Sequence, residues 1–366
     1  MIIGIDARAA AEVPAGRGRV VRELLPALDA LGTEHRFELF CRRPWRDVEL
    51  GPRFAWREIA LPDPLWHAAA AVRSRGAMDA FFSTNSYLTA WMLSPPCVIL
   101  VHDLIAFLPS ARGQARATRI ERATIRPAIR RAARLVCNSR STEADLIRLF
   151  PRSAGKTSVI GFAAGERFHD PPRGARLAAI LDEHGAAEDG FVLASGTLEP
   201  RKNLPRLVRA HARLPEPLRR SHPLLIAGPH GWEQDELMRT ARGREDVRLL
   251  GFVPEEHLAA LYGAASVFCY PSLYEGFGLP VLEAMAAGAC VVTSDRSSLP
   301  EVGGDAVVYA NPDDEASIAR ALERLLSAPE ERRALGERGR ARARTMSWEQ
   351  TARGVVDEVE RAVRGQ

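Results

Sequence analysis

Lysine is almost absent from this chain. Of its 50 basic residues only Lys156 and Lys202 are lysines, and the formal net charge is +4. We attribute the excess of arginine and alanine to the base composition of the genome. The scarcity of lysine also singles out each of the two lysines as a candidate functional residue.

Long hydrophobic runs are missing as well. No apolar stretch reaches the roughly 20 residues that a membrane-spanning helix needs, and Met1 leads directly into the strand-like segment Ile2–Asp6 without a signal peptide. There is no Cys-x-x-Cys pair. The five cysteines are typical of small core residues in a reducing compartment: Cys41, Cys97, Cys137, Cys269 and Cys290. We therefore expect a cytoplasmic protein, with or without peripheral attachment to the inner face of the membrane.

Short β-branched and apolar runs alternate with longer amphipathic stretches, which favours parallel sheets covered by helices. The first half holds six candidate strands: Ile2–Asp6, Phe37–Phe40, Ala80–Phe82, Cys97–Val101, Leu135–Asn138 and Ser158–Ile160. The second half holds another six: Phe191–Ser195, Leu224–Ala227, Val247–Leu250, Val267–Tyr270, Val291–Ser294 and Ala306–Tyr309. Because 366 residues are too many for one typical core, we expect an α/β protein with two doubly wound domains.

Two segments punctuate this pattern. Gly161–Pro172 combines glycines with paired prolines, which predicts a linker. Near the other end of the chain, Ser347 and Gln350 form a capping-box pattern, which predicts a last helix that runs through Ala362.

The most informative segment is YEGFGLPVLEAMAA, residues 274–287. Its glycines let backbone N–H groups approach a ligand, and Pro280 suits the first position of a helix. We expect this helix to continue through Leu282–Ala287 and to end at Gly288. The start of such a helix is an anion site, and phosphate is its usual ligand.

Two carboxylates, Glu275 and Glu283, lie eight positions apart in the same segment. Beside a phosphate they would be repelled, so they must face neutral hydroxyl groups on either side of the bound anion. A sugar, a diphosphate and a ribose fit this order. The alternative interpretation is a strand-to-helix turn with solvated acids.

The segment is similar to the Glu-x₇-Glu motif of retaining GT-B glycosyltransferases, especially those of glycosyltransferase family four. The resemblance implies two Rossmann-like doubly wound domains that face a cleft. It also implies that Glu275 contacts the transferred hexose and that Glu283 holds the ribose of a nucleotide-sugar. Loop amides would bind the hexose and the phosphates, and they belong to Gly276, Phe277, Gly278 and Leu279.

The resemblance further implies how the domains divide the work. Residues 1–163 would bind the acceptor, and residues 164–347 would bind the nucleotide-sugar donor. In GT-B proteins the final helix, which corresponds to residues 348–366, returns to the first domain.

Two adjacent cations, Arg201 and Lys202, follow a predicted buried strand. They would stabilise the charge of a departing nucleoside diphosphate, and family members carry Arg-x₄-Lys or Arg-Lys-Asn at this place. A solvated basic turn is the alternative. The chain has no Asp-x-Asp motif to hold Mg²⁺ or Mn²⁺, and Asp313 and Asp314 are expected to cap the helix that starts at Ala316. We therefore expect neither a metal nor a cofactor in the reaction.

A histidine and an aspartate, His102 and Asp103, directly follow the apolar strand Cys97–Val101. The end of such a strand places side chains toward a cleft. The pair is similar to a His-Asp pair of family four, which implies that His102 faces the hexose and that Asp103 orients or deprotonates the acceptor hydroxyl. A hydrogen-bonded structural histidine is the alternative.

Weaker signals surround these motifs. Gly16 and Gly18 resemble the Gly-x-Gly-Arg segment that lies against the diphosphate in this family, although Arg17 replaces the usual apolar residue between them. Val21 stands where a dinucleotide fingerprint needs a third glycine, which disfavours a nicotinamide dehydrogenase. By resemblance to relatives, the backbone of Val253 is expected to contact the nucleobase.

Six arginines recur at helical spacing and would form one stripe on a continuous helix: Arg112, Arg116, Arg119, Arg126, Arg130 and Arg134. Pro127 would kink that helix. The stripe could meet anionic lipid headgroups or a polyprenyl diphosphate. Alternatively, the six residues form a solvated helix face, and their recurrence reflects only the high arginine content of the chain.

Together these patterns predict a retaining, metal-independent hexosyltransferase. The spelling YEGFGLP with a His-Asp pair resembles bacterial mannosyltransferases of surface-polysaccharide assembly, so we expect GDP-mannose as the donor and a saccharide or lipid-linked hydroxyl as the acceptor. A UDP-hexose donor is the first alternative, and a GT-B epimerase or phosphorylase is another. A non-catalytic nucleotide-sugar-binding protein conflicts with the presence of both glutamates and both cations. Nucleic-acid binding is the alternative from a different class. The arginine stripe permits it, but aromatic residues are not interleaved with the basic ones, so no nucleic-acid partner is expected.

Overall fold

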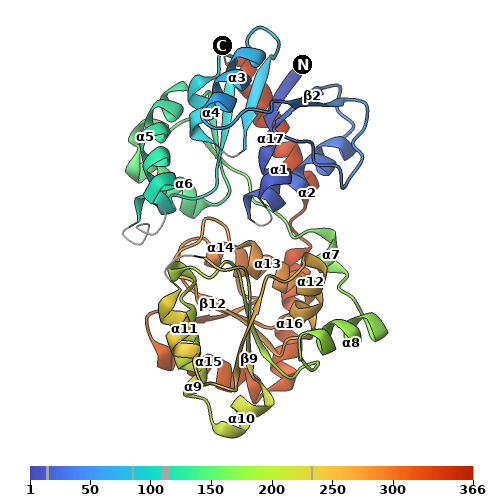
Figure 1. Ribbon diagram of the computed structural model, residues 1–366, viewed down its shortest axis with the longest axis vertical. Helices are drawn as coiled ribbons and strands as arrows, with labels where there is room; N and C mark the ends of the chain where they lie inside the picture. The colour runs from blue at the N-terminus through green and yellow to red at the C-terminus, as the bar shows by residue number, and fades with distance from the viewer. Residues whose placement is uncertain (14–15, 85, 109–114, 232–233, 366) are drawn as a thin grey trace. The chain divides into compact units, whose positions relative to one another are not determined.

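The computed structural model describes residues 1–13, 16–84, 86–108, 115–231 and 234–365. The chain forms two compact units. Unit 1 comprises Met1–Phe162 and Ser347–Gln366, and unit 2 comprises Ala163–Met346. Each unit is built on one parallel sheet with helices on both of its faces, and both chain ends lie in unit 1 (Figure 1).

The sheet of unit 1 has seven parallel strands in the order β3-β2-β1-β4-β5-β6-β7. Their bounds are β1 Ile2–Asp6, β2 Arg36–Cys41, β3 Phe54–Glu58, β4 Ala80–Ser83, β5 Cys97–Val101, β6 Arg134–Cys137 and β7 Thr157–Val159. The prediction of six strands is therefore wrong by one. The missed strand, β3, pairs only with β2 at the edge of the sheet and ends in Arg57 and Glu58, so it lacks the apolar run that marks a central strand.

Helices cover both faces of this sheet. They are α1 Arg8–Glu12, α2 Arg17–Ala30, α3 Leu65–Ser74, α4 Tyr87–Met92, α5 Ala115–Arg131, α6 Arg140–Leu149 and α17 Trp348–Arg364, with short 3₁₀ helices at Ile105–Phe107 and Pro151–Ser153. One core cluster of this unit includes the interface between the sheet and α5, where Ile99 and Val101 belong to the same cluster as Ile125 and Ile129. Burial of such aliphatic side chains is the main stabilising term for a domain of this kind.

The predicted last helix is present as α17, which packs on α2 and on the central strands of unit 1. The Ser347 hydroxyl accepts the backbone N–H of Gln350 at 3.1 Å, which caps the helix start. The hydroxyl of Thr351 donates to the carbonyl oxygen of Gly161 at 2.7 Å. The Glu358 carboxylate forms an ion pair with Arg134 of β6, and the Glu360 carboxylate lies 3.1 Å from His35 Nε2.

The sheet of unit 2 has six parallel strands in the order β10-β9-β8-β11-β12-β13. They are β8 Val192–Ser195, β9 Leu224–Ala227, β10 Val247–Gly251, β11 Val267–Tyr270, β12 Val291–Ser294 and β13 Val308–Ala310. All six predicted strands of the second half are present, with ends displaced by at most two residues. Together with the first sheet, they confirm the α/β class.

Ten helices of unit 2 lie within the residues that the structure describes: α7 Glu166–His169, α8 Gly174–Glu183, α9 Leu204–Ala212, α10 Glu216–Ser221, α11 Asp235–Ala241, α12 Glu255–Ala264, α13 Leu279–Ala287, α14 Leu299–Gly303, α15 Glu315–Leu326 and α16 Pro329–Ala343. The Asp314 carboxylate accepts the N–H of Ala316 at 2.8 Å at the start of α15, as predicted. The predicted linker Gly161–Pro172 contains the boundary between the two units, but it also contains the short helix α7, which was not predicted. Phe168 of α7 is fully buried, with its ring 5.9 Å from that of Tyr262.

The structure also bears on the cysteines and on the capacity of the helices to span a membrane. All five cysteines are buried and free, as expected for small core residues. Among the helices that the structure describes, none combines the length and the apolar character needed to cross a bilayer.

Candidate active site

The carboxyl edge of the sheet in unit 2 gathers most of the predicted donor-binding residues. Strands β8, β11 and β12 are consecutive neighbours and run parallel, so the loops that follow them meet at one edge. Arg201 and Lys202 lie after β8 in the 3₁₀ helix Pro200–Lys202. Glu275 lies in the loop after β11, and Ser297 and Ser298 lie in the loop after β12.

Glu275 is the centre of a buried polar network. Its Oε1 accepts from Lys202 Nζ at 2.7 Å, from the Tyr270 hydroxyl at 2.8 Å and from the Ser272 hydroxyl at 2.7 Å. Arg201 Nη1 lies 2.7 Å from the same oxygen. Among the described residues, none donates to Oε2. The carboxylate is therefore held firmly by one oxygen, while the other keeps its capacity to accept.

The network is balanced in charge. Glu199 forms an ion pair with Arg201, so two carboxylates face two cations. Burial alone would raise the pKa of Glu275, but Arg201 and Lys202 lower it to about 2. Burial and the neighbouring Arg201 lower the pKa of Lys202. A formally neutral set of this kind is buried at far less cost than an isolated charge.

Several members of this network were not singled out from the sequence: Glu199, Tyr270, Ser272, Ser297 and Ser298. Ser297 and Ser298 fix the backbone of the loop. The Ser297 hydroxyl accepts the N–H of Glu275 at 2.8 Å, and the Ser298 hydroxyl donates to the carbonyl oxygens of Glu275 and Phe277 at 3.0 and 2.7 Å. A polar residue at the end of every parallel strand is the signal that could have pointed to them.

Backbone conformation sets the start and the end of α13. Gly278 precedes the helix with φ 111°, and Gly288 ends it with φ 87°. Both values lie in the region that favours glycine. A Cβ on Gly278 would come within 2.8 Å of the Leu299 side chain. The helix begins at Leu279, ahead of the expected first position at Pro280.

The remaining donor-binding candidates also lie in unit 2. Glu283 is on α13 and is only 1% exposed. Gly276, Phe277, Gly278 and Leu279 form the turn into α13, and Phe277 is 8% exposed. Val253 is buried and precedes Pro254, the residue that caps α12. The structure thus brings Arg201, Lys202 and Glu275 into direct contact.

His102 and Asp103 lie in unit 1, at the carboxyl end of β5. His102 Nε2 lies 2.7 Å from the carbonyl oxygen of Thr84. A carbonyl oxygen can only accept, so Nε2 carries a proton in this contact. Burial and the charge of Arg17 lower the pKa of His102 to about 4, so the ring is neutral near pH 7 and its Nδ1 has an available lone pair.

The Asp103 carboxylate accepts the N–H of Ile105 at 3.0 Å and lies 3.8 Å from Arg17 Nη2. Gly16 precedes α2 with φ 54°. Gly18 serves a packing purpose within unit 1, because a Cβ there would lie 1.8 Å from the carbonyl oxygen of Val13. The structure therefore places Arg17, the unusual residue between the glycines, next to Asp103.

The expected arginine stripe is not continuous. Arg112 lies outside the described residues, as does the side chain of Arg116. Helix α5 continues through Pro127 but ends at Arg131, so Arg134 belongs to β6 instead of the helix. The stripe prediction is wrong at this end, because a chain turn separates the last two arginines.

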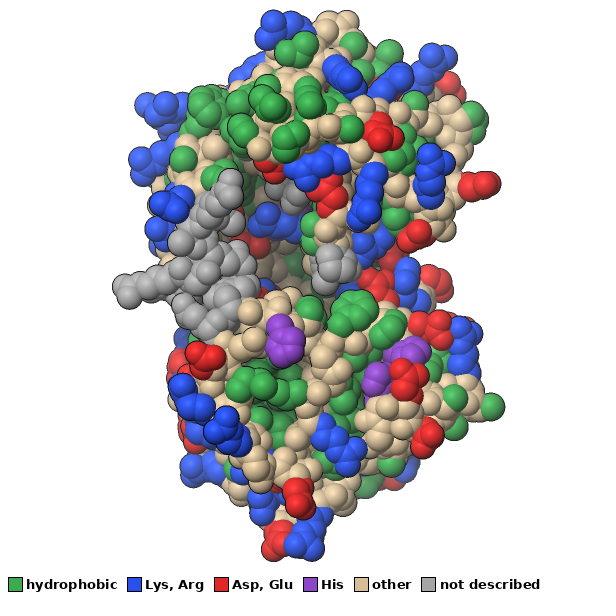
Figure 2. All heavy atoms as spheres, in the orientation of Figure 1, with side chains coloured by type: hydrophobic (Ala, Val, Ile, Leu, Met, Phe, Trp, Pro, Cys, Tyr) green, Lys and Arg blue, Asp and Glu red, His purple; other side chains and the backbone are tan. Residues whose placement is uncertain are grey.

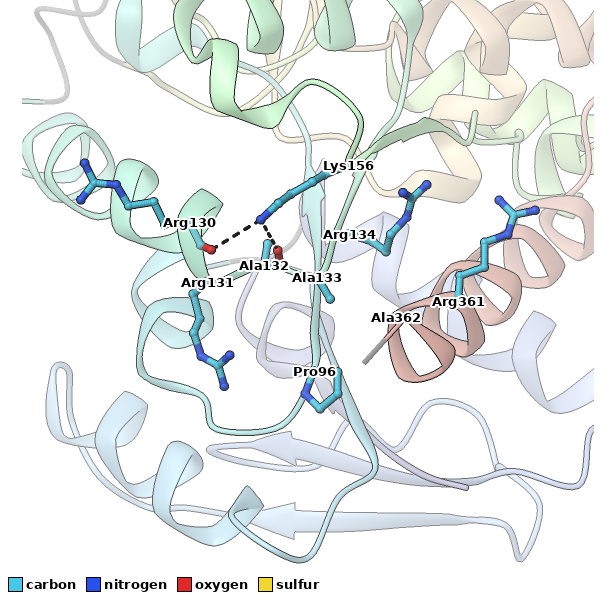
Figure 3. Close-up of a pocket in the computed structure, with 10 residues that line it drawn as sticks. Pro96, Arg130, Arg131, Ala132, Ala133, Arg134, Lys156, Arg361 and Ala362 are labelled. Carbon is cyan, nitrogen blue, oxygen red and sulfur yellow. Dashed lines mark hydrogen bonds between the residues drawn. The ribbon is translucent and has the colours of Figure 1, made fainter.

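Figure 3 shows the surroundings of Arg130 and Arg134. Arg130 and Arg134 point in different directions around a pocket of about 550 Å³ that is also lined by Lys156 and Arg361. Lys156 Nζ donates to the carbonyl oxygen of Ala132 at 2.8 Å, at the end of α5. Arg134 Nε donates to Glu358 at 2.6 Å. Lys156 thus stabilises the C-terminal end of α5, and Arg134 links β6 to α17.

Comparisons with known proteins agree with this architecture. Residues 14–161 match the family model described as Glycosyltransferase Family 4, and residues 179–342 match that described as Glycosyl transferases group 1. The chain is 40% identical over 211 residues to O-antigen chain mannosyltransferase B of Escherichia coli, which covers 57% of this chain and 55% of that protein. It is 32% identical over 232 residues to the serotype-specific mannosyltransferase WbdA of Escherichia coli, which covers 62% of this chain and 28% of that protein.

The chain therefore spans about half the length of the first relative and just over a quarter of the second. In structure, it is similar to sucrose-phosphate synthase from Thermosynechococcus elongatus, with a TM-score of 0.79, 22% identity and coverage of 100% of this chain and 99% of that one. The two family models match most of unit 1 and most of unit 2, and the structural match extends over the whole chain. The chain has the GT-B fold and belongs to glycosyltransferase family four.

Proposed function

We propose that this chain is a retaining, metal-independent hexosyltransferase that moves mannose from GDP-mannose to a hydroxyl group of a saccharide or a lipid-linked acceptor. We place the reaction in the synthesis of cell-surface polysaccharide. Support for the sugar comes from relatives whose names describe mannosyltransferases, one of them acting on the O-antigen chain. Unit 2 binds the donor in this proposal, and unit 1 binds the acceptor.

The observation that carries the proposal is the asymmetry of the Glu275 carboxylate. Its described contacts all fall on Oε1, and Oε2 keeps its capacity to accept. An ionised, rigid carboxylate oxygen is suited to accept a hydrogen bond from a hexose hydroxyl. Because Arg201 and Lys202 fix Oε1, the orientation of Oε2 is set before the sugar arrives, which lowers the entropic cost of binding.

The same cations suit a departing diphosphate. Charge grows on the leaving group as the glycosidic bond breaks, and fixed cations stabilise that charge more in the transition state than in the ground state. The N-terminus of α13 adds backbone N–H groups and a partial positive charge. With no Asp-x-Asp motif in the sequence, these groups take the part that a divalent ion plays in other transferases.

In unit 1, the proposal assigns His102 to the transferred hexose and Asp103 to the acceptor hydroxyl. A neutral His102 with an available Nδ1 accepts a hydrogen bond from a sugar hydroxyl. Asp103 orients the acceptor hydroxyl. We favour attack from the face that the diphosphate leaves: the acceptor oxygen bonds to the anomeric carbon, the bond from that carbon to the phosphate oxygen breaks, and the acceptor proton passes to the departing phosphate. This path retains the anomeric configuration.

Proton NMR of an early reaction mixture that contains EDTA tests the mechanism. From α-linked GDP-mannose we expect an α-linked product, formed at the same rate with and without the chelator. A β-linked product would remove the retaining assignment. Activity that is lost in EDTA and restored by Mg²⁺ or Mn²⁺ would remove the metal-independent one. A parallel reaction with UDP-glucose distinguishes the donor, because faster transfer from UDP-glucose would replace GDP-mannose.

Peripheral contact with a membrane is part of the proposal for a lipid-linked acceptor. Figure 2 shows apolar side chains gathered over α3 and α4 of unit 1. Leu65, Val72 and Trp91 there are 57%, 68% and 48% exposed. Arg73 and Arg75 lie beside them and are exposed. Exposed apolar side chains next to arginine suit the boundary between acyl chains and anionic headgroups.

Vesicle sedimentation tests this contact. The parent chain should bind vesicles that contain anionic phospholipid, and the double variant Leu65→Ser and Trp91→Ser should bind at least about tenfold more weakly, because two apolar side chains no longer enter the bilayer. Met238→Ser, which removes an apolar side chain that is 44% exposed in unit 2, is the matched control and should bind like the parent. Equal binding by all three proteins would refute the contact.

A further inference from the structure

Three potential metal ligands meet on the surface of unit 2. Glu183 and His184 lie at the C-terminal end of α8, and His257 lies in the first turn of α12. The ligand atoms of the three side chains lie within 4.8 Å of one another. His184 Nε2 is 3.2 Å from His257 Nδ1, and Glu183 Oε1 is 3.8 Å from the same Nδ1.

The separation of the two imidazole nitrogens matches the first coordination sphere of a transition metal. Two imidazole nitrogens at about 2.0–2.1 Å from a tetrahedral ion lie roughly 3.3 Å from each other. The observed 3.2 Å between His184 and His257 agrees with that value. The longer separation to Glu183 closes by rotation of its side chain, which is 65% exposed.

A hydrogen bond between the two imidazoles explains the short nitrogen distance but gives no role to Glu183. A shared cation uses all three residues. The two acids in the first turn of α12 already pair with arginines, Glu255 with Arg167 at 2.8 Å and Glu256 with Arg176 at 2.6 Å, so neither competes for the ion. Two imidazoles with one carboxylate form a ligand set that suits Zn²⁺, Ni²⁺ or Cu²⁺ and not Mg²⁺, which prefers oxygen ligands alone.

We propose that Glu183, His184 and His257 bind one divalent transition-metal ion of the Zn²⁺ class, with water in the remaining position. The site shares no residue with the Glu275 network and goes beyond the proposed transfer reaction, which needs no metal. It would join the end of α8 to the start of α12. Only Pro254 separates Val253 from the start of α12. The ion would therefore also fix the helix that supports the loop containing Val253.

Calorimetric titration of the chain with ZnCl₂ tests the site, using protein without a histidine tag and treated with chelator beforehand. We expect one ion per chain, with affinity lowered about tenfold or more in His184→Gln and in His257→Gln. Glu183→Gln should weaken binding by a smaller factor. MgCl₂ should give no saturable binding. Co²⁺ should show the visible absorption bands of a tetrahedral site in the parent and lose them in His257→Gln.

His35→Gln is the matched control. His35 pairs with Glu360 at 3.1 Å in unit 1, so it offers a histidine and a carboxylate without a third ligand, and its replacement should leave Zn²⁺ binding unchanged. Circular dichroism of each variant shows whether it is folded. Absence of saturable Zn²⁺ binding in the parent overturns the proposal, as does binding of equal affinity in a folded His257→Gln. Neither result bears on sugar transfer, which the NMR experiment judges separately.

Discussion

Replacing Lys202 with alanine is expected to lower the turnover of sugar transfer by roughly 10²-fold or more. The ammonium group contributes twice in the proposed mechanism: it stabilises the departing diphosphate, and it holds Glu275 Oε1 at 2.7 Å. Arg201→Ala should have an effect of similar size, because Arg201 contacts the same oxygen. Initial rates at saturating donor, expressed per folded molecule, measure the effect.

The chain supplies its own control for this experiment. Lys156 is the only other lysine, and it donates to backbone carbonyls at the end of α5 in unit 1. Lys156→Ala should therefore leave turnover near that of the parent. Because Lys202 is only 5% exposed, its loss should also destabilise unit 2 by up to about 3 kcal/mol, and urea unfolding separates this loss from catalysis. If the folded Lys202→Ala protein transfers sugar at the parental rate, the assigned role is wrong.

Substitution of Glu283 and substitution of Glu275 should have different effects on ligand binding and turnover. Glu283→Gln should weaken the binding of free nucleoside diphosphate and of intact nucleotide-sugar equally, by about 1–1.5 kcal/mol, because the ribose hydroxyl exchanges an ionised acceptor for a weaker, neutral one. Glu275→Gln should weaken the intact nucleotide-sugar and lower turnover, with little effect on the free diphosphate. Calorimetric titration of both variants with both ligands measures the difference.

Glu330→Gln provides the reference for these titrations, because its carboxylate is 83% exposed and pairs only locally with Arg333. It should bind both ligands like the parent. Equal losses for the two ligands in both glutamate variants would contradict the division of roles. A Glu275→Gln protein that loses affinity for the free diphosphate alone would place the first glutamate at the nucleotide instead of the hexose.

The sequence predicts the central strands well, because a strand that is buried on both faces is rich in apolar residues. The observed bounds of β1, β5, β9, β11 and β12 coincide with the expected ones, and each of these strands is an almost unbroken apolar run. Strand β3 lacks such an apolar run, since Arg57 and Glu58 at its end are exposed to solvent. The helix α7 was missed for a related reason: four residues rich in charge hide one buried aromatic side chain, Phe168.

Individual site residues were easier to predict than their contacts. The chemistry of Glu275, Arg201 and Lys202 can be read from residue type and from the preceding strands. Their mutual ion pairs cannot, because residues 201 and 275 are brought together only by the adjacency of β8 and β11 in the sheet. Sequence order places β9 and β10 between these two strands. The prediction of an arginine stripe was wrong at Arg134, because residues recurring at helical spacing do not reveal where the helix ends.

The packing of α17 on unit 1 has a consequence for biosynthesis. The first 162 residues leave the ribosome long before the last helix is made, and all of unit 2 is translated in between. Until α17 arrives, the surface of unit 1 that receives Ala352, Val355 and Val359 stays open to water. Unit 2 can complete its core first, although it is encoded second, which reverses the usual order in which domains fold on the ribosome. Residues 1–162 therefore keep this apolar surface uncovered while residues 163–346 are being made.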